Sequence, residues 1–94
     1  MRYAARADAN QPAIMAAARK LGAAVQSLHR VGSGCPDILI AYRGQNILVE
    51  IKDGAKSASQ RKLTPQQETW HAEWTGPIWV VKSVDELVDR MKEL

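Results

Sequence analysis

The sequence predicts a small α/β domain in which a mixed β-sheet is flanked by helices, in the order α-β-β-β-α-β-α. Apolar runs typical of strands lie at residues 37–42, 47–52 and 78–82. A short polar segment with a glycine joins the first two runs, which is typical of an antiparallel hairpin. A helix-like segment precedes the third run, so we expect that strand to pair in parallel with an earlier one.

The N-terminal part of the chain contains an alanine-rich helix, expected over residues 10–21. Pro12 falls in its first turn, where the missing N–H does little harm, and Gly22 supplies a stop. A further strand is expected at residues 24–29. A glycine-containing loop at residues 32–36 then leads into the hairpin.

The segment after the hairpin, residues 53–62, is polar and basic, and we expect a mobile loop there. The residues Thr64-Pro65-Gln66-Gln67 open the next helix, which ends before Gly76. The residues Ser83-Val84-Asp85-Glu86 have the pattern of a capping box and start a final amphipathic helix.

Three charged residues interrupt the apolar hairpin strands. Asp37 begins the first strand, and Glu50 and Lys52 lie two positions apart in the second. Because side chains alternate along a strand, Glu50 and Lys52 emerge on one face. Asp37 shares that face only if the hairpin loop has an even number of residues, since a slip of one residue reverses every side chain.

The expected connection is a two-residue turn at 44–45 or a four-residue loop at 43–46. Either connection pairs Leu39 with Glu50 and Asp37 with Lys52, so the two carboxylates are diagonal neighbours with Cβ atoms about 7 Å apart. Buried charges are costly unless they are paired or bound to metal. The register therefore predicts a divalent-cation site at this end of the hairpin. The opposite face is apolar and consists of Ile38, Ile40, Val49 and Ile51.

Length, charge and cysteine content fit one small domain spanning residues 1–94. The 94-residue chain has a net charge of +3, which mildly favours an anionic partner. The single cysteine, Cys35, excludes an internal disulfide and suits a reducing compartment. No apolar run reaches the length of a transmembrane helix and no signal-peptide core is present, so we expect a cytoplasmic protein without membrane contact.

The segments Pro36-Asp37, Glu50-Ile51-Lys52 and Gln67 resemble the motifs of the PD-(D/E)xK nuclease superfamily. Longer segments resemble its virus-type replication-repair nuclease (VRR-NUC) domain: Gly34-Cys35-Pro36-Asp37-Ile38-Leu39, Val49-Glu50-Ile51-Lys52-Asp53-Gly54 and Lys62-Leu63-Thr64-Pro65-Gln66-Gln67. The resemblance covers nearly the whole chain and is to the stand-alone form of phages and prophages. It implies a restriction-endonuclease-like core and a bacterial or phage-infected cell as the setting.

This resemblance implies an endonuclease that hydrolyses DNA and leaves 5′-phosphate and 3′-hydroxyl ends. Asp37, Glu50 and the backbone carbonyl of Ile51 would bind Mg²⁺ or Mn²⁺, cations that favour oxygen ligands. Lys52 would position or deprotonate the attacking water, or stabilise the transition state, and Gln67 would hydrogen-bond the lysine or the water. The stand-alone form is associated with homodimers that cleave branched DNA such as Holliday junctions, where two-fold symmetry suits paired cuts.

Each site residue also has a structural interpretation. Asp37 fits an exposed strand start, and Glu50 and Lys52 fit a solvated pair at a sheet edge. Gln67 fits a capping box in which its side chain reaches back to the Thr64 N–H, and this explains Gln67 as well as catalysis does. Taken together, the residues favour the metal site. The alternative function is a catalytically silent nucleic-acid-binding module on the same fold.

The sequence departs from the VRR-NUC pattern in its first helix, where many relatives carry a glutamate. This chain has no glutamate before Glu50. Asn10 or Gln11 could serve as an auxiliary residue at that position, or Asp8 could reach in. Asn10 is also the expected N-cap of the helix, which is the interpretation we favour.

Basic side chains are candidates for contacts with DNA phosphates, with simple solvation as the alternative for each: Arg30, Lys56, Arg61 and Lys62, together with His29 and Arg43. Trp70, His71 and Trp74 share a helical stripe with Gln67. We expect the tryptophans to pack against the sheet, and His71 has no partner at zinc-ligand spacing. No activating base is identifiable near Cys35, which we interpret as a small loop residue.

Overall fold

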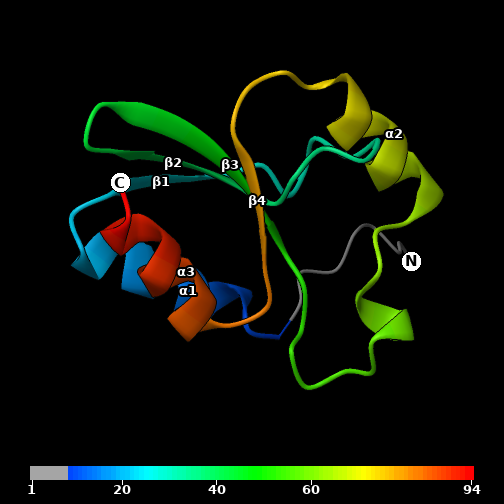
Figure 1. The fold of residues 1–94 in the computed structure, drawn as a ribbon, viewed down its shortest axis with the longest axis horizontal. Helices are drawn as coiled ribbons and strands as arrows, with labels where there is room; N and C mark the ends of the chain where they lie inside the picture. The colour runs from blue at the N-terminus through cyan, green and yellow to red at the C-terminus, as the bar shows by residue number, and fades with distance from the viewer. Residues whose placement is uncertain (1–8) are drawn as a thin grey trace.

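The computed structural model describes residues 9–94, which form a four-stranded sheet and three α-helices (Figure 1). The predicted mixed α/β class and the order of helices and strands are confirmed. Within the described residues, no helix is long and apolar enough to cross a membrane. In chain order the elements are α1 (Gln11–Lys20), β1 (Ala24–Ser27), β2 (Ile38–Tyr42), β3 (Gln45–Ile51), the 3₁₀ helix η1 (Ser59–Arg61), α2 (Pro65–Glu73), β4 (Ile78–Val81) and α3 (Val84–Lys92).

The sheet has the strand order β1-β2-β3-β4. β1 pairs antiparallel with β2, and β2 pairs antiparallel with β3. β4 pairs in parallel with β3, as predicted from the helix that separates them. The hairpin that carries the charged residues is therefore central, with one strand added on each side.

The hydrophobic core lies between the sheet and two helices, α1 and α3, which run side by side across one face (Figure 1). α1 also contacts β1, and α3 also contacts β4. All four residues of the predicted apolar hairpin face belong to this core and are at most 2% exposed: Ile38, Ile40, Val49 and Ile51. Because Glu50 alternates with Val49 and Ile51 along β3, its side chain lies on the opposite face of the sheet.

The hairpin register differs from the prediction by two residues. Leu39 pairs with Leu48, not with Glu50, and Tyr42 pairs with Gln45. The turn consists of Arg43 and Gly44, which have φ angles of 51° and 78°. Two positive φ angles are typical of the tight hairpin turn whose twist matches the strands. Since the loop still has an even number of residues, the predicted faces are correct although the predicted pairs are wrong.

Helix α2 stands apart from the α1/α3 layer, beside the loop that precedes β2 (Figure 1). No residue of α2 is buried. Trp70 and Trp74 stack on each other with ring centroids 4.8 Å apart and planes 19° apart. Trp74 is 48% exposed, so the prediction that it packs against the sheet is wrong. The side chains that α2 directs at the sheet are polar.

The helix caps were predicted in part. Thr64 and Gln67 form the complete capping box of α2, as expected. Ser83 accepts a hydrogen bond from the Glu86 N–H at 3.1 Å, but the Glu86 carboxylate accepts from the backbone N–H of Lys82, so the box at α3 is half formed. The predicted mobile segment 53–62 contains η1.

Candidate active site

The predicted site residues come together at one end of the hairpin, from three separate parts of the chain. Asp37 immediately precedes β2, Glu50 lies in β3, and Lys52 immediately follows β3. Gln67 lies in the first turn of α2. The sheet positions the three charged residues, and α2 adds the amide from the side.

Asp37 is held by the backbone of the neighbouring strand. Its N–H donates to the carbonyl of Val49 at 3.1 Å, and its Oδ2 accepts from the N–H of Ile51 at 2.6 Å. The carboxylate thus replaces a backbone acceptor at the end of the β2/β3 ladder. These contacts place Asp37 alongside residues 49–51. The predicted register placed Asp37 opposite Lys52, so that predicted pair is wrong.

Glu50 is a buried carboxylate whose side chain is 2% exposed. Its Oε2 accepts from Gln67 Nε2 at 3.2 Å and lies 3.9 Å from Lys52 Nζ. A buried charge with paired donors of this kind is tolerated, whereas an isolated one is not. The interpretation of Glu50 and Lys52 as a solvated edge pair is therefore wrong, because β3 is an internal strand and both side chains are largely buried.

Gln67 performs the capping role and also contacts both charged residues. Its Oε1 accepts from the Thr64 N–H at 2.9 Å and from Lys52 Nζ at 2.8 Å. Its Nε2 donates to Glu50, so one amide fixes the ammonium and the carboxylate relative to each other. The two interpretations of Gln67 left open by the sequence are compatible in this structure.

His71 also contacts Glu50, although no role in the site is predicted for it from the sequence. Its Nε2 lies 3.4 Å from Glu50 Oε1. Burial, and then the nearby Lys52 ammonium, lower the pKa of His71 below its ordinary value, which favours the neutral imidazole. The signal that could have identified it is its spacing of one helical turn from Gln67.

The donor set of the site fits a hard, oxygen-seeking cation. Within residues 9–94, no three His, Cys, Asp and Glu side chains are grouped so as to hold a metal ion. Asp37 and Glu50 lie on adjoining strand positions, and an ion there would draw its other ligands from backbone carbonyl oxygen and water. Mg²⁺ and Mn²⁺ accept such sets, whereas structural zinc requires more side-chain ligands.

Asn10 is at the N-terminus of α1, but its side chain does not cap the helix. Its Nδ2 donates to the carbonyls of Lys52 at 3.0 Å and Lys82 at 3.2 Å, which ties the ends of β3 and β4 together. Asn10 is therefore the N-cap residue by position, as predicted, but its side chain bonds across the sheet end and not to the helix. Among the described residues, Asn10 Oδ1 and Gln11 Oε1 are buried oxygens without a hydrogen-bond donor. Asp8 lies outside the described residues.

The loop before Asp37 fits closely against the start of α2. A Cβ on Gly34 would lie 2.5 Å from the carbonyl oxygen of Gln66, so only glycine fits there. Cys35 lies in this loop, and burial together with the Glu50 and Asp37 carboxylates raises the pKa of its thiol. A protonated thiol is a poor nucleophile, in agreement with its interpretation as a loop residue.

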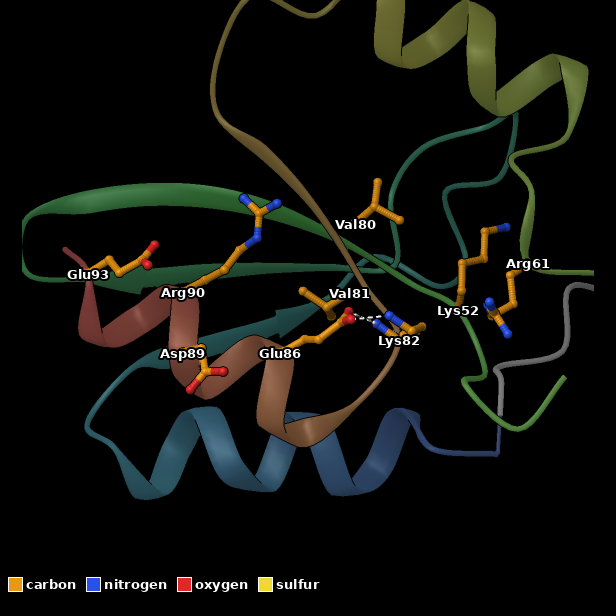
Figure 2. A pocket seen from close by; sticks show the side chains of 9 residues that line it. All are labelled: Lys52, Arg61, Val80, Val81, Lys82, Glu86, Asp89, Arg90 and Glu93. Atoms are coloured by element: carbon orange, nitrogen blue, oxygen red, sulfur yellow. Dashed lines mark hydrogen bonds and ion pairs between the residues drawn. The ribbon is translucent and has the colours of Figure 1, made fainter. Parts of the chain in front are cut away.

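The basic residues predicted to contact DNA differ in their distance from the site and in their partners. Arg61 and Lys52 lie at one end of a groove that runs along β4 and α3, with Arg90 farther along it (Figure 2). The groove also contains carboxylates, and Lys82 is paired with Glu86 there (Figure 2). Arg43 is at the hairpin turn, where its guanidinium donates to the carbonyl of Leu94. Of the other predicted phosphate contacts, His29 is partly buried and three are exposed: Arg30, Lys56 and Lys62.

The fold and the grouping of Asp37, Glu50, Lys52 and Gln67 define a nuclease-type α/β domain with a restriction-endonuclease-like core. A solved structure described as a VRR_NUC domain matches 89% of this chain and 95% of its own, with a TM-score of 0.65 and 26% sequence identity. No family model and no curated protein matches the sequence. The structural match confirms the predicted resemblance to the VRR-NUC domain.

Proposed function

We propose that this domain is an endonuclease that uses Mg²⁺ or Mn²⁺ to hydrolyse phosphodiester bonds in DNA. The observation that carries the proposal is the hydrogen-bonded set of Glu50, Lys52 and Gln67 beside Asp37. Two carboxylates and a fixed ammonium on one face of a sheet are suited to a phosphate group and poorly suited to stabilising the fold.

Asp37, Glu50 and the Ile51 carbonyl are the proposed cation ligands. When bound, the cation would supply charge neutralisation at the scissile phosphate and would activate water. The Ile51 N–H donates to Asp37, so the residue that carries the proposed carbonyl ligand is hydrogen-bonded to a proposed carboxylate ligand. The polypeptide therefore holds both donors in one rigid unit at the end of the β2/β3 ladder.

Lys52 is the proposed group that positions the attacking water or stabilises the transition state. Its Nζ donates to Gln67 Oε1, which fixes the ammonium while leaving other N–H groups for substrate oxygens. Hydrolysis forms a bond from water oxygen to phosphorus and breaks the bond to the 3′ oxygen, which leaves as a hydroxyl. A donated hydrogen bond from Lys52 would stabilise the negative charge that develops on phosphate oxygens.

A cleavage assay tests this proposal directly. Wild type and Lys52→Ala are incubated with linear, flap and four-way DNA, with Mg²⁺, Mn²⁺ or a chelator. Lys20→Ala is the matched control, because Lys20 is exposed at the end of α1. Metal-dependent cleavage by wild type and the control, and none by Lys52→Ala, is the expected result. DNA binding by wild type without cleavage under either metal would overturn the enzyme and favour a silent binding module.

We further propose that the substrate is branched DNA and that the active species is a homodimer. Both follow from the resemblance to stand-alone VRR-NUC domains, and the exposed Arg30, Lys56 and Lys62 with Arg61 would contact its phosphates. Equal cleavage of linear and four-way DNA would contradict the preference. Light scattering that gives a monomer at the concentrations of the cleavage assay would contradict the dimer.

A further inference from the structure

Both carboxylate oxygens of Glu50 contact side chains from one face of α2. Gln67 Nε2 lies 3.2 Å from Oε2, and His71 Nε2 lies 3.4 Å from Oε1. Gln67 and His71 are one helical turn apart, so their side chains project from the same side of the helix. The carboxylate is therefore held at two points by a single rigid element.

Both partners of the Glu50–His71 contact are shielded from water. The Glu50 side chain is 2% exposed and the His71 side chain is 13% exposed. A carboxylate in such surroundings needs donors to replace its lost hydration. His71 Nε2 is the ring nitrogen that faces Glu50 Oε1, and the tautomer with its proton on Nε2 makes His71 such a donor.

We infer that His71 is a positioning residue, whose Nε2–H donates to Glu50 Oε1 and fixes the orientation of that carboxylate for the divalent cation. The inference rests on the proposed function of Glu50 as a metal ligand. Carboxylates that bind metals are themselves hydrogen-bonded by outer residues, and loss of such a partner typically lowers metal affinity or activity about 10- to 100-fold.

A packing role for His71 makes a different prediction. The imidazole ring meets Trp70 edge to face, with centroids 6.4 Å apart and planes 73° apart. If this contact were its whole purpose, leucine would serve at position 71 about as well as histidine. If hydrogen bonding to Glu50 is its purpose, glutamine should serve, because its amide nitrogen reaches about as far as Nε2, and leucine should fail.

Calorimetric titration with Mn²⁺, without DNA, separates the two roles. His71→Leu is expected to lower Mn²⁺ affinity about 10- to 100-fold, and His71→Gln to retain most of it. Glu73→Gln is the control, because Glu73 is an exposed residue of the same helix. Wild-type affinity in His71→Leu, or equal losses in both variants, would overturn the inference. Circular dichroism verifies that each variant is folded.

The tautomer of His71 provides a test that needs no metal. The nitrogen NMR spectrum of the metal-free protein at neutral pH is expected to show a protonated Nε2 and a bare Nδ1. A bare Nε2 would overturn the inference even if Mn²⁺ binds. Conversely, a protonated Nε2 in a wild-type protein that binds no Mn²⁺ would support the Glu50 contact while rejecting the proposed metal site. If His71→Leu does not fold, His71→Gln and the tautomer still decide.

Discussion

Replacing Gln67 with alanine tests whether contacts within the site hold α2 in place. Gln67 makes two kinds of interaction: the capping box with Thr64, and the contacts with Lys52 and Glu50. Thr64→Ala removes a capping bond but leaves the contacts with the charged residues. The difference between the two variants therefore isolates the contribution of the site.

The two losses differ in size. Losing the Thr64 cap costs about 1 kcal/mol. Hydrogen bonds to charged groups contribute about 1.5–3 kcal/mol each, and water that enters beside the partly exposed Lys52 recovers some of this. We therefore expect Thr64→Ala to lower the free energy of unfolding by about 1 kcal/mol, and Gln67→Ala to lower it by about 3 kcal/mol.

Urea denaturation followed by circular dichroism measures both variants. With a slope of about 1–2 kcal/mol/M for a small protein, a gap of about 2 kcal/mol separates the two midpoints by about 1–2 M. The slopes themselves should not change. Equal midpoints for Thr64→Ala and Gln67→Ala would refute the reasoning, because Gln67 would then act as a cap alone.

Three further outcomes are expected. Gly34→Ala should lower the free energy of unfolding more than Gly32→Ala does in the same denaturation assay. Both glycines have positive φ, but only a Cβ on Gly34 would meet the Gln66 carbonyl oxygen, at 2.5 Å. Equal losses of stability would exclude that close approach. Because burial lowers the pKa of His71 in the folded protein, stability should be full above about pH 6.5 and fall below it, and His71→Gln should flatten this dependence; parallel profiles would contradict it. Mn²⁺ at about 100 times its Kd should raise the unfolding free energy by about 2.7 kcal/mol in thermal melts of wild type and not of Glu50→Gln, and equal shifts would place the ion elsewhere.

The faces of the hairpin could be predicted because they depend only on alternation along each strand. The pairs could not, because they depend on which two residues form the turn. The observed turn requires a positive φ at Arg43, and arginine gives no local signal for that conformation. A glycine at the second position is compatible with several turns, so the sequence left the register open by two residues.

The position of α2 relative to the sheet could not be predicted from the sequence either. Two tryptophans on the stripe with Gln67 are typical of a core-facing helix, yet Trp70 and Trp74 stack on each other and Trp74 remains exposed. The motif identified Gln67, because it lies at a fixed distance from a recognisable helix start. Asn10 could not be interpreted from local rules, since the two carbonyls it binds lie far along the chain.

Because α2 contains no buried residues, the helix that carries Gln67 and His71 is not part of the hydrophobic core. The apolar cluster that stabilises the fold is built from the sheet, α1 and α3, and does not include α2. Amides of α2 should therefore exchange with solvent through local openings that leave the rest folded. A change in the length or outer surface of this helix therefore leaves every residue of the apolar cluster in place.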